Sequence, residues 1–271
     1  MRYINTRFID DLNYGELAYF LDQVKSNRTT LSLEVRNGYI NIYYKGGNLL
    51  KITQKIKGYS FHFDAKYCKN KGSDKNFELL NNLCNSDTES YIKHFELMMA
   101  EMDSWFAKHP KEERDYQHRL LVNNPEIVDI EYQIGHSMRL DMLMFKDGDL
   151  FIVENKFGTG AIGGTAGLSK HYSDICKILG DSNIREEIID SVCHISEAKQ
   201  ALGLNKSTIE KSNITSMQIL FLLANYNSNS QTLNNELKKM NGSVPAQILM
   251  TTNDQFILDL SIAKDVFLLE E

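Results

Sequence analysis

Three charged residues, Asp141, Glu154 and Lys156, stand where they could form one chemical site. Glu154 and Lys156 follow the apolar run Leu150–Val153, which reads as a buried strand. Side chains two residues apart in a strand point to the same face, so Glu154 and Lys156 share a face. Charged groups at the end of such a run need partners, because burying an unpaired charge is costly.

A predicted hairpin brings Asp141 to the same place. Asp147-Gly148 is typical of a two-residue turn and would pair Lys146 with Asp149, give or take one residue. Opposite residues of an antiparallel hairpin have residue numbers with a constant sum, so Asp141 then lies opposite Glu154. The sequence therefore predicts two carboxylates and one lysine on one face of a hairpin.

This grouping suits hydrolysis of a phosphodiester with a divalent metal ion. Magnesium prefers carboxylate oxygens and keeps several waters, and a bound metal ion lowers the pKa of a water that becomes the nucleophile. A neighbouring lysine can position that water and balance charge. Two acids alone also occur in glycosidases, which do not require the lysine. The plain structural alternative is a surface ion pair worth about 0–1 kcal/mol.

The surrounding elements are predicted from apolar periodicity and from Pro and Gly positions. They describe a mixed α/β layer fold. In chain order we expect helices at 88–108 and 111–123, strands within 126–135, 139–146 and 149–157, helices at 166–180 and 183–203, a strand at 215–225, a helix at 230–240 and a strand at 245–252.

With Asp141, Glu154 and Lys156 in the pattern D-x12-E-N-K, the chain resembles the PD-(D/E)xK nuclease superfamily, which has the restriction-endonuclease-like fold. The family's αβββαβ core matches helix 111–123, the three strands, helix 166–180 and strand 215–225. The resemblance covers about residues 88–251. The proline of the family name is absent, since Arg139 and Leu140 precede Asp141.

The resemblance implies roles for individual residues. Asp141 and Glu154 would bind Mg²⁺, for which Mn²⁺ would substitute, and the backbone carbonyl of Asn155 would be a further ligand. Lys156 would assist the attacking water. Removing either acid is expected to leave folding largely intact, because two clustered carboxylates repel each other.

The family often carries an accessory acid, for which Glu113 is the first candidate and Glu112 and Glu131 are alternatives. For either helix acid alone, a solvated helix face is the favoured explanation. Residues placed to contact substrate are Arg139, Lys170 and Tyr172, although Tyr172 could equally be a packing residue. None of the seven histidines has HxH or HExxH spacing, so we expect structural or exposed roles for them.

The segment Gly158–Gly163 spells GxGxxG between a strand and a helix. In dinucleotide-binding proteins this pattern opens the helix of a βαβ unit. Here Glu154, Asn155 and Lys156 interrupt the apolar strand, and no clear βαβ unit precedes it. We interpret the glycines as a flexible lead into the helix, or as a close approach of backbone to phosphate.

Residues 1–71 form a predicted module of their own, a small antiparallel α+β unit with one helix and four short strands, and residues 72–271 form the nuclease-like domain. The module holds 12 basic and 6 acidic residues, whereas the other 200 residues hold 18 and 30. This asymmetry is a weak pointer to a polyanionic partner for the module, and on charge alone two solvated surfaces are the favoured interpretation. The module could also recognise a protein partner or mediate dimerisation. The candidates for phosphate contact are Arg28, Arg36, Lys45, Lys51, Lys55 and Lys57.

The composition is that of an ordinary folded protein, with 42% hydrophobic and 24% charged residues. No apolar stretch is long enough for a membrane span, and four scattered cysteines without a CxxC pair suit the reducing cytoplasm. The composition thus favours a cytoplasmic protein, and the resemblance implies an Mg²⁺-dependent endonuclease of bacterial defence or DNA processing. DNA is favoured over RNA, and double-strand cleavage would favour a homodimer. The alternatives are an inactive nucleic-acid- or protein-binding module that keeps the fold and, more remotely, a dinucleotide-binding enzyme.

Overall fold

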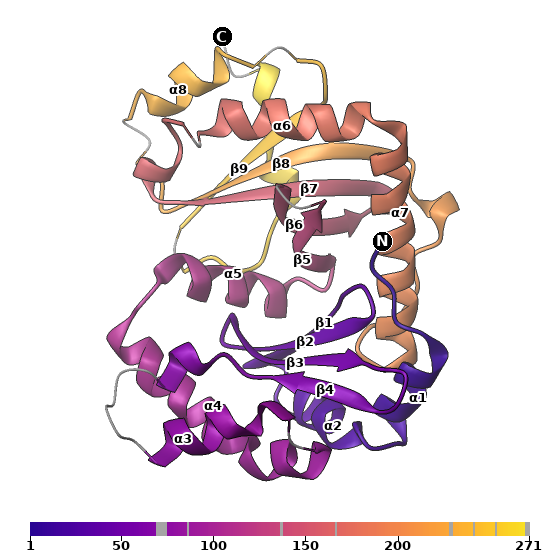
Figure 1. The fold of residues 1–271 in the computed structure, drawn as a ribbon. Coiled ribbons are helices and arrows are strands. Elements are labelled where there is room, and N and C mark those ends of the chain that lie inside the picture. Colours follow the sequence, from indigo (N-terminus) through magenta and orange to yellow (C-terminus); the bar gives the residue numbers. More distant parts are fainter. Residues whose placement is uncertain are drawn as a thin grey trace. The chain divides into compact units, whose positions relative to one another are not determined.

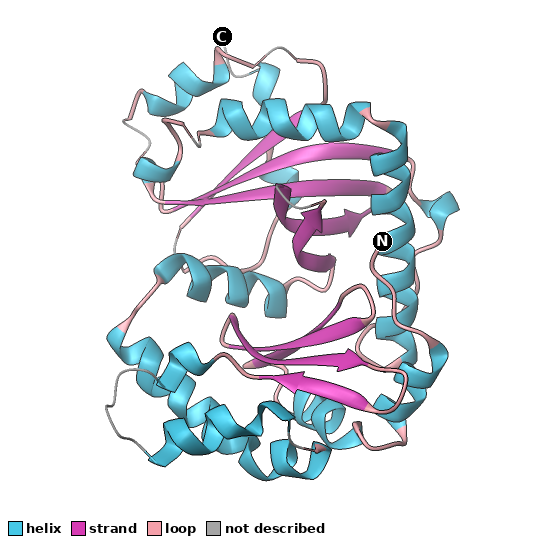
Figure 2. Cartoon of the chain, in the orientation of Figure 1, coloured by secondary structure: helices cyan, strands magenta, loops and turns pink. Residues whose placement is uncertain are grey.

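The computed structural model describes residues 1–68, 75–85, 87–135, 138–165, 167–227, 230–240, 242–252 and 254–268. It shows a mixed α+β protein with two separate sheets (Figure 1, Figure 2). None of the helices in these ranges is long and apolar enough to cross a lipid bilayer. His136, one of the seven histidines, lies outside the described residues.

The chain divides into two compact units, neither of which is one continuous segment. The first unit contains Met1–His118 and His194–Thr208, and the second contains Arg119–Cys193 and Ile209–Glu271. The predicted boundary between residues 71 and 72 lies outside the described residues. The first unit nevertheless extends well beyond it, so it is larger than the predicted module 1–71.

The first unit is larger because a long helix completes its core. Helix α4 (Thr88–Lys108) follows the short helix α3 (Lys75–Asn81) and packs on the first sheet. The ring of Tyr91 on α4 stacks on that of Phe61, with centroids 4.7 Å apart. Trp105 meets Tyr67 edge to face at 5.4 Å. The predicted helix 88–108 is confirmed, but it belongs with the N-terminal sheet.

The first sheet is an antiparallel meander. Its strands lie in the order β1 (Leu31–Val35), β2 (Tyr39–Tyr44), β3 (Gly47–Gln54) and β4 (Tyr59–His62), preceded by the helices α1 (Thr6–Asn13) and α2 (Ala18–Ser26). The tight turn between β2 and β3 is Lys45-Gly46, where both residues have positive φ. Gly47, which follows this turn, begins β3. A Cβ on Gly47 would lie 2.7 Å from Phe106, so the absence of a side chain at this position lets α4 pack closely against β3.

The second sheet has the strand order β10-β9-β8-β7-β6-β5. Strands β5, β6 and β7 are antiparallel neighbours, while β7, β8 and β9 are parallel. The strands expected from the sequence are confirmed. Their bounds are β5 (Ile127–Ile134), β6 (Met138–Lys146), β7 (Asp149–Phe157), β8 (Ser216–Ala224) and β9 (Ala246–Thr251). The sheet also has a short strand that the sequence did not predict, β10 (Lys264–Asp265).

Four further helices accompany this sheet in the chain: α5 (Glu112–Asn123), α6 (Leu168–Gly180), α7 (Ser182–Ala201) and α8 (Thr232–Leu237). Helix α7 belongs to both units, which divide it between Cys193 and His194. The apolar run of β8 is continuous because this strand is central and parallel to its neighbours, with six successive buried residues from Ile219 to Ala224.

Candidate active site

The hairpin of β6 and β7 has the predicted register. The two strands pair from Lys146 with Asp149 to Met142 with Val153. Asp147 and Gly148 both have positive φ, as a tight two-residue turn requires. The pairing ends at Met142 and Val153, so Asp141 and Glu154 are the next residues of the two strands beyond the paired segment.

The carboxylate of Asp141 is anchored to the neighbouring strand. Its Oδ2 accepts a hydrogen bond from the backbone N–H of Asn155 at 3.0 Å. A bond from an N–H to a charged carboxylate is stronger than a neutral one. Asp141 is therefore held beside the residues that follow Glu154 in β7.

Glu154 and Lys156 form a buried ion pair on one face of β7. Glu154 Oε1 lies 2.9 Å from Lys156 Nζ, and the two side chains are only 4% and 12% exposed. Because a charge removed from water requires a partner, each side chain is stabilised by the other. This arrangement changes the expectation that Glu154 can be removed without loss of stability, since its removal would leave Lys156 without this partner.

His171 on α6 is the third member of this cluster. Its Nδ1 lies 3.0 Å from Glu154 Oε1, and its Nε2 lies 3.1 Å from Lys156 Nζ. An ammonium group only donates, so Nε2 accepts from Lys156 and the ring hydrogen is assigned to Nδ1, the nitrogen nearer to Glu154. Glu154 Oε1 thus lies within ion-pair distance of two side chains.

The sequence predicted the helix that carries His171. The residues chosen on it as substrate contacts, however, were the neighbours Lys170 and Tyr172. His171 lies three residues after Leu168 and four before Ile175, and both of these are buried. Such spacing places a residue on the inward face of a helix, and this signal could have identified His171.

The substrate-contact candidates Lys170, Tyr172 and Arg139 are engaged in other contacts. Lys170 pairs with Asp174 one turn along α6. Tyr172 is 2% exposed, and burial raises its pKa. Its hydroxyl donates to the carbonyl of Val244 and accepts from the same residue's N–H. Of the two interpretations offered for Tyr172, the structure shows the packing role.

Arg139 lies 3.3 Å from Glu131, and both side chains are exposed. Glu131 has φ of 51° within β5, an uncommon conformation for a residue other than glycine in a strand. Glu113 and Glu112 stand exposed in the first turn of α5, in the first unit. The choice of accessory acid therefore stays a prediction.

The start of α6 is held by a glutamate from α8. Glu236 is 2% exposed and accepts hydrogen bonds from Ser169 N at 3.1 Å and Ser169 Oγ at 2.5 Å. Lys239 Nζ lies 2.6 Å from its other oxygen. Burial alone would raise the pKa of Glu236, but the hydrogen bonds from Lys239 and Ser169 outweigh it and lower that pKa. The residue preceding the helix, Gly167, offers no side-chain cap, so Glu236 serves instead.

The glycine-rich segment does not form the turn of a dinucleotide site. A short 3₁₀ helix, Thr159–Ala161, follows β7, and α6 begins only at Leu168. The first glycines therefore do not open the helix, as they would in a dinucleotide fold. Gly158 has φ of 79°, and Thr159 Oγ1 accepts from the N–H of Asn227 at 2.8 Å, which ties the segment to the end of β8.

The donor types at this site suit magnesium. Two carboxylates and a backbone carbonyl are hard oxygen donors, and Mg²⁺ is commonly bound through one or two carboxylates plus several waters. Within the described residues, no three His, Cys, Asp or Glu side chains come close enough to hold an ion by themselves. Asp141, Glu154 and the carbonyl of Asn155 are oxygen donors of the types that Mg²⁺ prefers, and a metal site formed by them stays a prediction.

The basic candidates of the N-terminal sheet differ in their surroundings. Arg36 is buried, Arg28 donates to the carbonyl of Gly203 at 2.7 Å, and Lys45 pairs with Asp103 at 2.7 Å. These three side chains are thus used within the first unit. The other three candidates lie on β3 or in the turn before β4, where Lys51 covers the ring of Tyr39 and Lys55 and Lys57 are exposed.

Comparison of the chain with models of protein families, with curated proteins and with solved structures gave no match.

Proposed function

We propose that the protein is a metal-dependent nuclease, with DNA favoured as its substrate, acting in bacterial defence or DNA processing. One observation carries this proposal: the Glu154–Lys156 ion pair is buried at the end of β7, next to the strand position of Asp141. Charged side chains are rarely buried unless they are paired, and buried charged groups with specific partners are common at functional sites. Two acids and a lysine in this relation supply what metal-assisted phosphodiester hydrolysis requires.

The order of the elements supports the proposal. Helix α5, three antiparallel strands, helix α6 and the parallel strand β8 follow one another in the chain as in the restriction-endonuclease-like core, with α7 added before β8. The acids of the proposed site lie on the second and third of these strands. The family assignment rests on this order and on the D-x12-E-N-K pattern.

The proposed roles follow from the contacts. Asp141 and Glu154 would hold Mg²⁺, which supplies charge stabilisation and an acidified water when bound. Lys156 presents an ammonium group beside Glu154 and would orient the attacking water or meet the phosphate. His171 keeps that ammonium group in place by accepting from it through Nε2.

The test is cleavage of plasmid DNA, single-stranded DNA and RNA with and without Mg²⁺. Asp141→Asn and Lys156→Met are expected to reduce the rate at least about a hundredfold, since each removes a charged group from the transition state. Glu186→Gln and Lys177→Met change exposed residues of the same unit and serve as matched controls. Undiminished cleavage by both site variants would refute the proposal.

An inactive binding module that keeps the fold is the second candidate. The observation favouring it is that Glu154 Oε1 already faces both Lys156 and His171, as in a structural ion pair. This candidate predicts nucleic-acid or protein binding that neither requires Mg²⁺ nor depends on Asp141. Calorimetric titration of Mg²⁺ into the parent and the Asp141→Asn variant distinguishes the two.

A further inference from the structure

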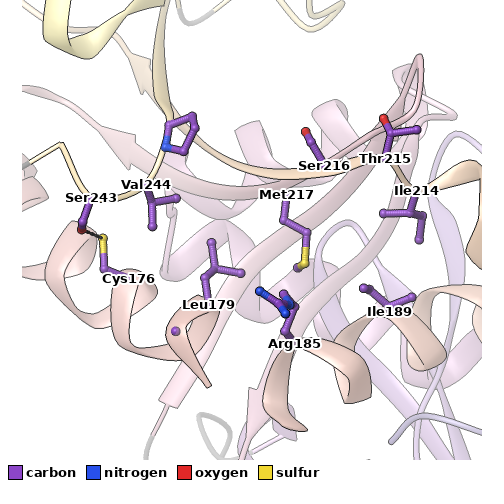
Figure 3. Close-up of a pocket in the computed structure, with 12 residues that line it drawn as sticks. Cys176, Leu179, Arg185, Ile189, Ile214, Thr215, Ser216, Met217, Ser243 and Val244 are labelled. Atoms are coloured by element: carbon purple, nitrogen blue, oxygen red, sulfur yellow. Dashed lines mark hydrogen bonds between the residues drawn. The ribbon is translucent and has the colours of Figure 1, made fainter. Parts of the chain in front are cut away.

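A pocket of about 560 Å³ lies at the edge of the second sheet where β8 and β9 begin. Its walls come from the end of α6, the first turns of α7 and the segments that lead into the two strands (Figure 3). Ser216 in its wall pairs with Asp149 at the start of β7, whereas Lys156 pairs with Leu223 near the other end. Seven strand residues span roughly 23 Å, so this pocket is separate from the candidate active site.

The walls of the pocket are largely apolar. Leu179, Ile189, Ile214, Met217 and Val244 all contribute side chains to it. The two hydroxyls from the start of β8 are already engaged, since Thr215 Oγ1 donates to the carbonyl of Gly148 and Ser216 Oγ donates to Asp149. Because both hydroxyls already donate to acceptors of the protein, the remaining walls suit an aliphatic group.

One charged residue, Arg185, lines this pocket, and Figure 3 shows its side chain directed inward toward Met217. Within the described part of the chain, the Arg185 guanidinium has neither an ion pair nor a hydrogen bond to a side chain or carbonyl. The nearby Asp181 accepts from the N–H groups of Asn183 and Ile184 at the start of α7. Arg185 is an exposed residue, so its guanidinium is a solvent-accessible donor group in the wall of the pocket.

We propose that this pocket binds a small amphipathic carboxylate, with its aliphatic chain against the apolar walls and its carboxylate on Arg185. A guanidinium matches a carboxylate through two parallel hydrogen bonds. A single guanidinium balances one negative charge, which favours a carboxylate over a doubly charged phosphate. The volume lies within the range of roughly 300–1,000 Å³ that is typical of small-molecule sites. This ligand is independent of the proposed nuclease activity.

The test is calorimetric titration of the full-length protein with decanoate, decanol, decyl phosphate and inorganic phosphate. Decanoate is expected to bind saturably, decanol and decyl phosphate at least about tenfold more weakly, and inorganic phosphate not measurably. Arg185→Gln should weaken decanoate binding at least about tenfold. Lys177→Gln, an exposed change on α6 outside the pocket, should leave it unaltered.

A second variant, Ile189→Trp, fills the pocket and should abolish decanoate binding while thermal unfolding confirms that the protein is folded. Ile189 is only partly buried, so the larger ring can be accommodated without disrupting the core. The proposal is overturned if decanoate does not bind below its micellar concentration or binds Arg185→Gln as tightly as the parent. Equal affinity for decanol, or tighter binding of decyl phosphate, would overturn the assignment of a carboxylate.

Discussion

Lys156 Nζ lies 3.1 Å from His171 Nε2, so a hydrogen bond joins a side chain of β7 to a side chain of α6. Both residues also contact the same oxygen of Glu154. Lysine, imidazole and carboxylate therefore form a closed triangle, in which each member has the other two as partners. The ammonium group of Lys156 is fixed from two directions before any substrate binds.

The first prediction is that Glu154 and Lys156 are energetically coupled. A double-mutant cycle of Glu154→Gln and Lys156→Met, followed by chemical denaturation, should give a coupling free energy of about 1–3 kcal/mol, because the pair is buried. The same cycle for the exposed pair of Lys170 and Asp174 should give no more than about 0.5 kcal/mol. Equal coupling in both cycles would show that burial adds nothing to the Glu154–Lys156 pair.

Asp141→Asn separates folding from metal binding. The amide oxygen of asparagine can still accept from the N–H of Asn155, so the free energy of unfolding should change by less than about 1 kcal/mol. Affinity for Mg²⁺ should fall at least about tenfold, since the variant lacks one carboxylate charge. Calorimetric titration and urea denaturation measure the two effects. Unchanged Mg²⁺ affinity would remove Asp141 from the metal site.

Glu236→Gln tests the support of α6 by α8. The pKa of Glu236 in the folded protein lies below its ordinary value of 4.5, so its charged form adds stability above that pH. This contribution is lost as pH falls through the lower, folded-state pKa. The variant should therefore be less stable than the parent at pH 7, with a difference that shrinks in acid. A difference that is constant across this range would contradict the assigned hydrogen bonds.

Lys199→Met tests a buried ion pair in the first unit. Lys199 Nζ lies 2.8 Å from Glu34 Oε2, and the side chains are 8% and 1% exposed. Removing one partner of such a pair costs roughly 3–5 kcal/mol of unfolding free energy. Lys211→Met, at an exposed ion pair with Glu186, is the control and should be indistinguishable from the parent in denaturation.

The fifth prediction concerns the basic turn before β4. If Lys55 and Lys57 contact phosphate, the double variant to glutamine should reduce the slope of log affinity against log salt by about 0.9 for each lost contact on duplex DNA. Lys45→Gln changes a residue already paired with Asp103 and should leave the slope nearly as it was. An unaltered slope in the double variant would contradict phosphate contact by these lysines. It would favour a protein partner or a second copy of the chain for this surface.

Local sequence patterns were sufficient to predict the strands of the second sheet and the register of its central hairpin. The alternation of polar and apolar residues determines which face each side chain takes, and Asp147-Gly148 determines the turn. These two facts alone predicted the register from Lys146 with Asp149 to Met142 with Val153, the pair next to Asp141 and Glu154. Neither required knowledge of any distant part of the chain.

The remaining features depend on contacts between segments far apart in the sequence. His171 meets Glu154 only because α6 packs on the face that carries the acid, and this packing is not encoded near residue 154. The larger first unit likewise depends on the return of residues 194–208 to the N-terminal sheet. Arg28 and Glu34 find their partners, Gly203 and Lys199, in that returning segment.

Because α7 is divided between the two units, it also affects the order in which contacts can form while the chain is being synthesised. Chains emerge from the ribosome N-terminus first, at about 5–20 residues per second. Glu34 is synthesised early, but its counter-ion Lys199 follows 165 residues later. The buried acid of the N-terminal sheet therefore lacks this partner until residues 119–193 of the second unit have been translated, and the strands β8 and β9 of that unit are synthesised later still.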